Sequence, residues 1–177
     1  MKNQKYQQLV DLIVFAMLGV IMFISKYLTD LLPNIHFLGM LTMTYTIVYR
    51  KKALIPIYVF VMLIGIFNGF AMWWIPYLYI WTILWAITML LPKKMSKKVA
   101  IPIYAVVCAL HGLCYGTLYA PAQAIMFGLN FKGMLTWIAT GFYFDVIHGI
   151  GNFALGFLIV PLSTALQKFH KTAKKEN

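Results

Sequence analysis

Residues 135–166 read LTWIATGFYFDVIHGIGNFALGFLIVPLSTAL, an almost uninterrupted apolar run in which Asp145 is the only charged residue. A helix that spans a bilayer needs about 20 apolar residues, so this run predicts a helix inside a membrane. The whole chain has the same character, because 62% of its 177 residues are hydrophobic and only 11% are charged. Soluble domains have about 25% charged residues. The composition excludes a soluble globule and predicts an integral membrane protein.

Charge clusters and Pro/Gly positions divide the chain into six apolar segments, which predict one all-α transmembrane domain, residues 1–177. Continuous apolar runs argue against a membrane β-barrel, whose strands alternate in hydrophobicity. Residues 122–133 are apolar but contain glycines, and we expect either a loop folded onto the bundle or a half-inserted helix. The expected spans are Leu9–Leu28, Ile35–Tyr49, Ala53–Phe70, Tyr77–Leu91, Val99–Tyr119 and an unusually long Leu135–Leu166.

Basic residues are in large excess, with 15 Lys and Arg against 4 Asp and Glu, which gives a net charge of +11. An even number of spans places both termini on one side, where thirteen of the fifteen cations also fall; only Lys26 and Lys132 fall on the other. Positive residues favour the cytoplasmic side of a membrane. We therefore expect a multi-pass protein of the cell membrane with both termini in the cytoplasm, and no nucleic-acid partner.

Asp145, His148 and Asn152 fall on one face of the sixth expected span, together with several glycines, at about 100° per residue. A charged side chain at mid-membrane costs about 2.5–3.5 kcal/mol on insertion scales. These polar groups either hydrogen-bond neighbouring helices or form a ligand site. In a ligand site, Asp145 would accept from a cationic or N–H group, and Asn152 would both donate and accept.

Two further spans carry candidate ligand contacts. In the fifth, His111 and Tyr115 share a face, where a lone histidine is either a packing residue or a ligand contact. In the fourth, Trp81 and Trp85 lie deeper than an interfacial aromatic belt reaches and are suited to stacking on a planar ligand. Trp73 and Trp74, just before that span, are typical of the belt itself.

Several catalytic signatures are absent from the sequence. There is no P-loop motif and no serine in a G-x-S-x-G setting. Asp145 and His148 are spaced for metal binding, but no helix offers a clear third ligand, so we expect neither a metal nor a cofactor. The alternatives left open are a small intramembrane enzyme with Asp145 and His148 as an acid/base pair, and a structural membrane subunit without a ligand.

The topology, the segment Asp145-x-x-His148-Gly-x-Gly-Asn152 and the basic tail resemble the substrate-capture S component of energy-coupling factor (ECF) vitamin transporters. The first span, with Ala16–Phe23 and the following loop Leu31-Leu-Pro-Asn34, is similar to that family's opening. The resemblance covers essentially the whole chain, and the sixth span carries most of it.

The resemblance implies a six-helix subunit that captures a vitamin or related micronutrient at the outer face of the membrane. Such a subunit works with a coupling transmembrane subunit and two ATPase subunits, which use the ATP. The family's sites lie in the outward half of the bundle. Mapped onto this sequence, the implied pocket residues are Trp73, Trp74, Tyr77, Trp81, Gln123, Trp137, Asp145, His148 and Asn152.

S components that share a coupling module often carry an Ala-x-x-x-Ala patch on the first helix for docking. The corresponding place here reads Ala16 and Val20, with Gly19 adjacent, so the small surface remains while the motif does not. For the ligand, the aromatic fourth span and one buried aspartate favour a small planar, nitrogen-containing heterocycle over a strongly anionic compound.

Overall fold

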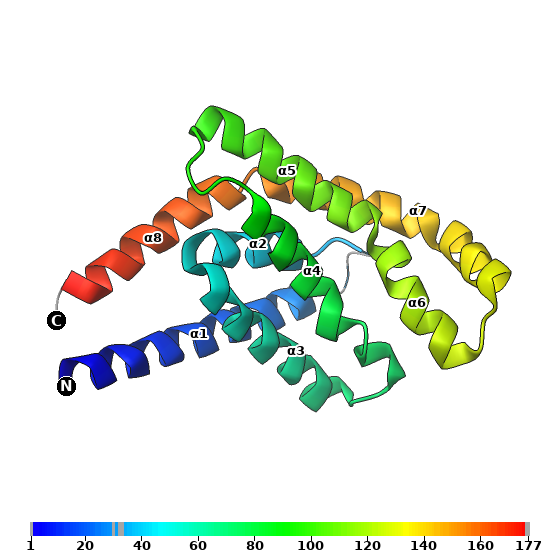
Figure 1. Cartoon of the computed structure of the whole chain (residues 1–177), viewed down its shortest axis with the longest axis horizontal. Coiled ribbons are helices and arrows are strands. Elements are labelled where there is room, and N and C mark those ends of the chain that lie inside the picture. The colour runs from blue at the N-terminus through cyan, green and yellow to red at the C-terminus, as the bar shows by residue number, and fades with distance from the viewer. Residues whose placement is uncertain (1, 30, 32–33, 176–177) are drawn as a thin grey trace.

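A computed structural model describes residues 2–29, 31 and 34–175 of the chain (Figure 1). Helices make up 87% of the structure, and the described residues contain no strand, which confirms the all-α prediction. The elements are α1 (Lys2–Thr29), α2 (Leu38–Tyr49), the 3-10 turn η1 (Arg50–Ala53), α3 (Leu54–Asn68), the 3-10 turn η2 (Met72–Trp74), α4 (Tyr77–Leu90), α5 (Lys97–Leu113), α6 (Tyr115–Phe127), α7 (Phe131–Gly156) and α8 (Ile159–Lys175).

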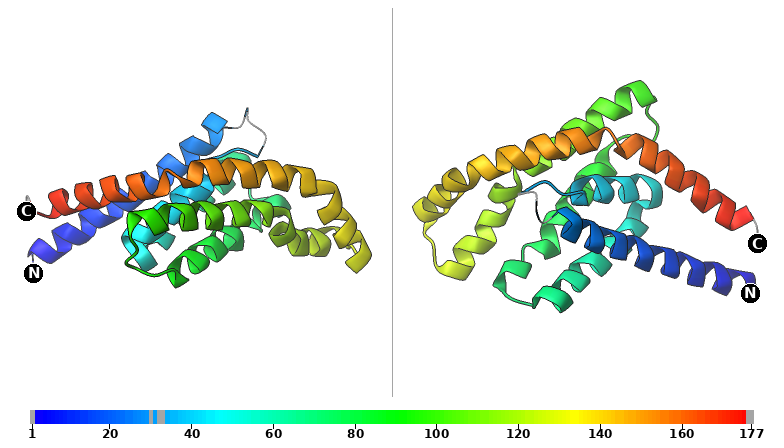
Figure 2. Two further views of the ribbon diagram at one scale, coloured as in Figure 1. Left: turned by 90° about the horizontal axis from the view of Figure 1, so that it is seen from above. Right: turned by 180° about the vertical axis from the view of Figure 1, so that it is seen from behind.

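The beginning of α1 and the end of α8 lie at the same end of the molecule (Figures 1 and 2). The Lys52 ammonium, on η1, forms an ion pair with the Asp11 carboxylate on α1 at 2.9 Å. This arrangement agrees with an even number of crossings. Which side of the membrane that end faces stays a prediction from the charge distribution.

Four helical stretches are long and apolar enough to cross a membrane, or five if α7 and α8 together form one broken span. These stretches make the chain a membrane-type protein. The second of them, Leu38–Asn68, contains two of the expected spans. Taken singly, α2 and α3 rise only about 18 and 22 Å, short of the roughly 30 Å hydrocarbon core. Six separate crossings therefore stay a prediction.

The fifth expected span differs from the structure at its end. The helix breaks at Cys114 between α5 and α6, and α6 then continues through Pro121 to Phe127. Gly128 ends α6 in the left-handed conformation, with φ of +63°. The side chain of Asn130 accepts a hydrogen bond from the Gly133 N–H at 2.8 Å and caps α7. Residues 122–133 are therefore the end of one helix, a short turn and the start of the next.

The sixth expected span is two helices rather than one. α7 ends at Gly156, and α8 begins at Ile159 with its axis bent by 50°. Pro161 explains the position of the bend, because it lacks the N–H that would bond to the carbonyl of residue 157. The bend directs the basic C-terminal helix back toward α1 (Figure 2).

The glycines of α7 allow it to lie unusually close to α5, which forms the largest interface in the bundle. A Cβ added at Gly156 would lie 2.5 Å from the Ala105 Cα, and one added at Gly149 would lie 2.5 Å from Leu113 Cγ. On the α5 side, a Cβ at Gly112 would approach the His148 carbonyl to 2.9 Å. The small residues therefore bring the backbones of α5 and α7 together and fix which face of α7 meets α5.

Candidate ligand site

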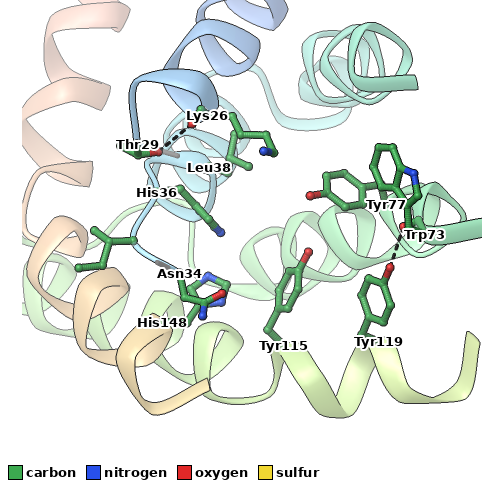
Figure 3. Close-up of a pocket in the computed structure, with 11 residues that line it drawn as sticks. Lys26, Thr29, Asn34, His36, Leu38, Trp73, Tyr77, Tyr115, Tyr119 and His148 are labelled. Atoms are coloured by element: carbon green, nitrogen blue, oxygen red, sulfur yellow. Dashed lines mark hydrogen bonds between the residues drawn. The ribbon is translucent and has the colours of Figure 1, made fainter. Parts of the chain in front are cut away.

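A cavity of about 380 Å³ lies between the end of α1, the α1–α2 connection, η2 and the start of α4, α6 and α7 (Figure 3). Its size falls within the range of small-molecule sites. Of the expected loop Leu31–Asn34, residues 32 and 33 lie outside the described part of the chain, as does residue 30. The cavity is lined by Lys26, Thr29, Asn34, Ile35, His36, Leu38, Trp73, Tyr77, Tyr115, Tyr119 and His148.

Two histidines form one side of the cavity. Asn34 has a positive φ of +57°, a conformation that asparagine tolerates better than most residues, and it precedes the short stretch that leads into α2. His36 in that stretch meets His148 of α7, with their ring centroids 4.5 Å apart in an edge-on arrangement. In Figure 3 the His36 side chain points toward the side of the cavity that carries Tyr77 and Trp73.

The tyrosines of α6 form the remaining wall. Tyr115 packs against His148 with a centroid separation of 4.9 Å. One turn further along, the Tyr119 hydroxyl donates to the Trp73 carbonyl at 2.8 Å and ties α6 to η2. The cavity is thus walled by rings from five separate segments, and the bond from Tyr119 to Trp73 fixes the spacing of two of them.

Trp81 and His111 lie beneath this wall rather than in it. Trp81 is 1% exposed, and its ring packs against His111 and Tyr115 at 5.8 and 6.0 Å between centroids. The His111 Nε2 atom lies 3.2 Å from the Ile80 carbonyl oxygen. Both residues therefore support the rings that line the cavity.

A second hollow, of about 290 Å³, shares Asn34, Tyr115 and Tyr119 with the cavity. Its other walls come from Gly116 on α6 and from Trp137, Gly141, Phe144 and Asp145 on α7. The Asp145 Oδ1 atom accepts a hydrogen bond from the Gly116 N–H at 2.9 Å. Trp137 stacks on Tyr119, with ring planes 19° apart.

Asp145 and His148 share a face of α7, as the helical spacing predicts, but they line different compartments. Tyr115 contributes to both. Among the described residues, no hydrogen bond joins Asp145 to His148. The tertiary structure therefore separates two residues that the sequence places one turn apart.

Asn152 lies deeper, at the junction of α2, α5 and α7, and is 1% exposed. Its Nδ2 atom donates to the Cys108 carbonyl at 3.2 Å and lies 3.1 Å from the position of a Cβ added at Gly39. It lines neither compartment. Asn152 therefore contacts α5 and α2 from α7, while its Oδ1 atom is buried and has no hydrogen-bond partner among the described residues.

Three other expected ligand residues also lie outside both compartments. The Trp74 indole donates to the Val61 carbonyl at 2.8 Å, and the Trp85 indole donates to the Arg50 carbonyl at 3.1 Å. Gln123 is half-buried near the end of α6. Trp85 is therefore held at the end of the bundle where the basic Arg50–Ala53 turn lies.

Sequence reasoning missed Tyr119, which lines both compartments, and it also missed His36. His36 stands at the start of the second apolar run, where a polar group among apolar residues was a usable signal, but nothing in the spacing linked it to α7. Lys26, noted only as an outward cation, also lines the cavity, and it is the only lining residue with a full positive charge among those the structure describes.

The expected docking residues on α1 divide between two faces. Gly19 is buried, and a Cβ there would lie 2.5 Å from Val59 Cγ1 on α3. Ala16 and Val20 are exposed. Gly19 therefore serves the α1–α3 contact, and only the other two side chains remain accessible to a partner.

Within residues 2–29, 31 and 34–175, no group of three His, Cys, Asp or Glu side chains is placed to hold a metal ion.

Comparison of the chain with known protein families, with curated proteins and with solved structures finds no match. The geometry of the cavity and the chemistry of its walls are therefore the basis for any functional conclusion.

Proposed function

We propose that this chain is a membrane-embedded substrate-capture subunit of the ECF S-component type, which binds a small planar vitamin-like compound in the cavity beside His36 and His148. The observation that carries the proposal is an unpaired ring nitrogen in the wall of the cavity. His148 is 2% exposed, and its Nε2 atom has no hydrogen-bond partner among the described residues. Buried polar atoms are almost always paired, so a lone ring nitrogen beside a cavity fits a site that is completed by a ligand.

The aromatic walls favour a flat ligand. Rings of Tyr77, Tyr115 and Tyr119 and of Trp73 provide apolar faces for stacking, and their polar tips can orient a heterocycle. Ligand sites of this kind are mainly apolar with a few placed polar groups. The cavity therefore supports a planar compound with hydrogen-bonding ring atoms better than a flexible or strongly charged one.

The transport role needs partners, because the sequence has no P-loop with which to hydrolyse ATP. In the proposed assembly a coupling transmembrane subunit and two ATPases supply the energy. The exposed Ala16 and Val20 on α1 offer a small-residue surface to the coupling subunit. The cavity faces the outside of the cell membrane in this proposal, and both termini lie in the cytoplasm with thirteen of the fifteen cations.

Calorimetric titration of the full-length protein in nanodiscs with a panel of water-soluble vitamins tests the proposal. We expect saturable binding of one panel member, weakened about tenfold in His36→Leu, because losing one hydrogen-bonding group costs about 1–1.5 kcal/mol. Trp85→Phe is the control, since Trp85 lies outside both compartments, and it should bind like the wild type. Absence of binding by every panel member, or equal binding by His36→Leu, would contradict the proposal.

A further inference from the structure

The hollow beside Asp145 differs in chemistry from the cavity that it adjoins. Its one ionisable carboxylate is 6% exposed, and the rest of its wall is formed by aromatic rings, the Asn34 side chain and two glycines. The acid lies in α7, within a pair of helices that together are apolar enough to span a membrane. A carboxylate in such surroundings is costly unless a partner compensates its charge.

The Asp145 carboxylate is only half satisfied by the protein. Oδ1 accepts from the Gly116 N–H, whereas Oδ2 is buried and has no hydrogen-bond partner among the described residues. Gly116 is essential to this approach, because a Cβ there would lie 2.4 Å from Oδ2. The backbone of α6 therefore holds the carboxylate in the wall of the hollow, with one oxygen that no donor of the described residues satisfies.

The shape of the hollow indicates what could reach that oxygen. Trp137 and Tyr119 present nearly parallel rings, with centroids 5.9 Å apart. On the same helix as Asp145 and one turn earlier, Gly141 leaves open space, since a Cβ there would meet no atom within 4 Å. Aromatic faces attract cations, and a carboxylate binds a planar N–H donor through paired hydrogen bonds.

We infer that this hollow is a second compartment of the ligand site, which takes a planar, positively charged group with N–H donors while the neighbouring cavity takes a flat ring. The inference rests on the proposed function, because the two compartments share Asn34, Tyr115 and Tyr119 as common walls. The ligand then has two parts: a flat ring in the cavity beside His36 and His148, and a charged group beside Asp145.

Three probes of the same size separate charge from shape: benzamidine, benzamide and benzoate are a planar cation, a neutral amide and an anion on one ring. Saturation-transfer NMR on the full-length protein in nanodiscs measures the affinity of each. We expect benzamidine to bind at least tenfold more tightly than benzamide, and benzoate to bind most weakly. Asp145→Asn should reduce benzamidine to the level of benzamide, since the amide oxygen still accepts from Gly116 but carries no charge.

The variant Gly141→Leu tests whether benzamidine binds in the hollow beside Asp145. The new side chain enters the open space and should abolish benzamidine binding, whereas Ala139→Leu adds the same side chain at an exposed position on the same helix and should leave binding unchanged. Equal affinities for benzamidine and benzamide in the wild type, or normal benzamidine binding by Gly141→Leu, would overturn the inference.

The same variants distinguish this inference from the proposed function. If a vitamin of the panel binds wild type and Gly141→Leu equally, the second compartment is excluded while the capture role stands. If no vitamin binds but benzamidine shows the expected dependence on Asp145 and Gly141, the compartment stands and the capture role fails.

Discussion

Gly156→Leu should lower the free energy of unfolding by about 3 kcal/mol, because a larger side chain in this close helix contact pushes α7 away from the backbone of α5. Even a Cβ at this position would lie 2.5 Å from the Ala105 Cα, which is backbone on α5. For a chain of this length the loss corresponds to about 6–12 °C in the unfolding midpoint. Intrinsic tryptophan fluorescence during heating in detergent measures the shift.

Gly141→Ala is the matched control on the same helix. Its new Cβ meets nothing within 4 Å, and alanine is favoured over glycine in a helix by about 1 kcal/mol. We expect this variant to melt slightly above the wild type. If both variants melt at the wild-type midpoint, the close α5–α7 contact does not support the fold.

Tyr115→Ala should abolish ligand capture, with a loss of about 100-fold in affinity, or about 2.7 kcal/mol. The Tyr115 ring belongs to both compartments and packs against His148 and Trp81. Its removal would merge the two compartments and leave the flat part of the ligand without a stacking partner. Titration with the vitamin that binds the wild type measures the effect.

Tyr115→Phe separates the ring from its hydroxyl. Because the ring contacts remain, this variant should lose at most about tenfold in affinity, which is the value of one hydrogen bond. The melting temperature of each variant reports whether it is folded. A folded Tyr115→Ala protein with wild-type affinity would show that the Tyr115 ring does not contact the ligand.

The helical segments could be predicted from the sequence because a bilayer demands long apolar runs, whatever their partners. The breaks within those runs were harder to predict. The fifth span was expected to run to Tyr119, but the helix breaks at Cys114, and α6 then continues through Pro121 to Phe127. Gly112 and Gly116 flank this break, but glycines inside an apolar run do not by themselves show where a helix ends.

For the site, the 3.6-residue period was enough to place Asp145, His148 and Asn152 on one face of α7, and the structure confirms that all three are buried. Their separate surroundings could not be predicted. His148 meets the cavity, Asp145 meets the hollow, and Asn152 joins three helices, because different helices cover successive turns of α7.

By itself, the sequence determined that this is an all-helical chain of membrane type, since composition and hydrophobic patterning act without regard to tertiary contacts. Only the tertiary structure decided that His36 reaches His148, that Tyr115 separates two compartments, and that Trp85 and Asn152 lie outside them. The physical reason is that such a site is made of rings from distant segments. Their meeting depends on how closely glycines such as Gly112 and Gly156 let the helices approach.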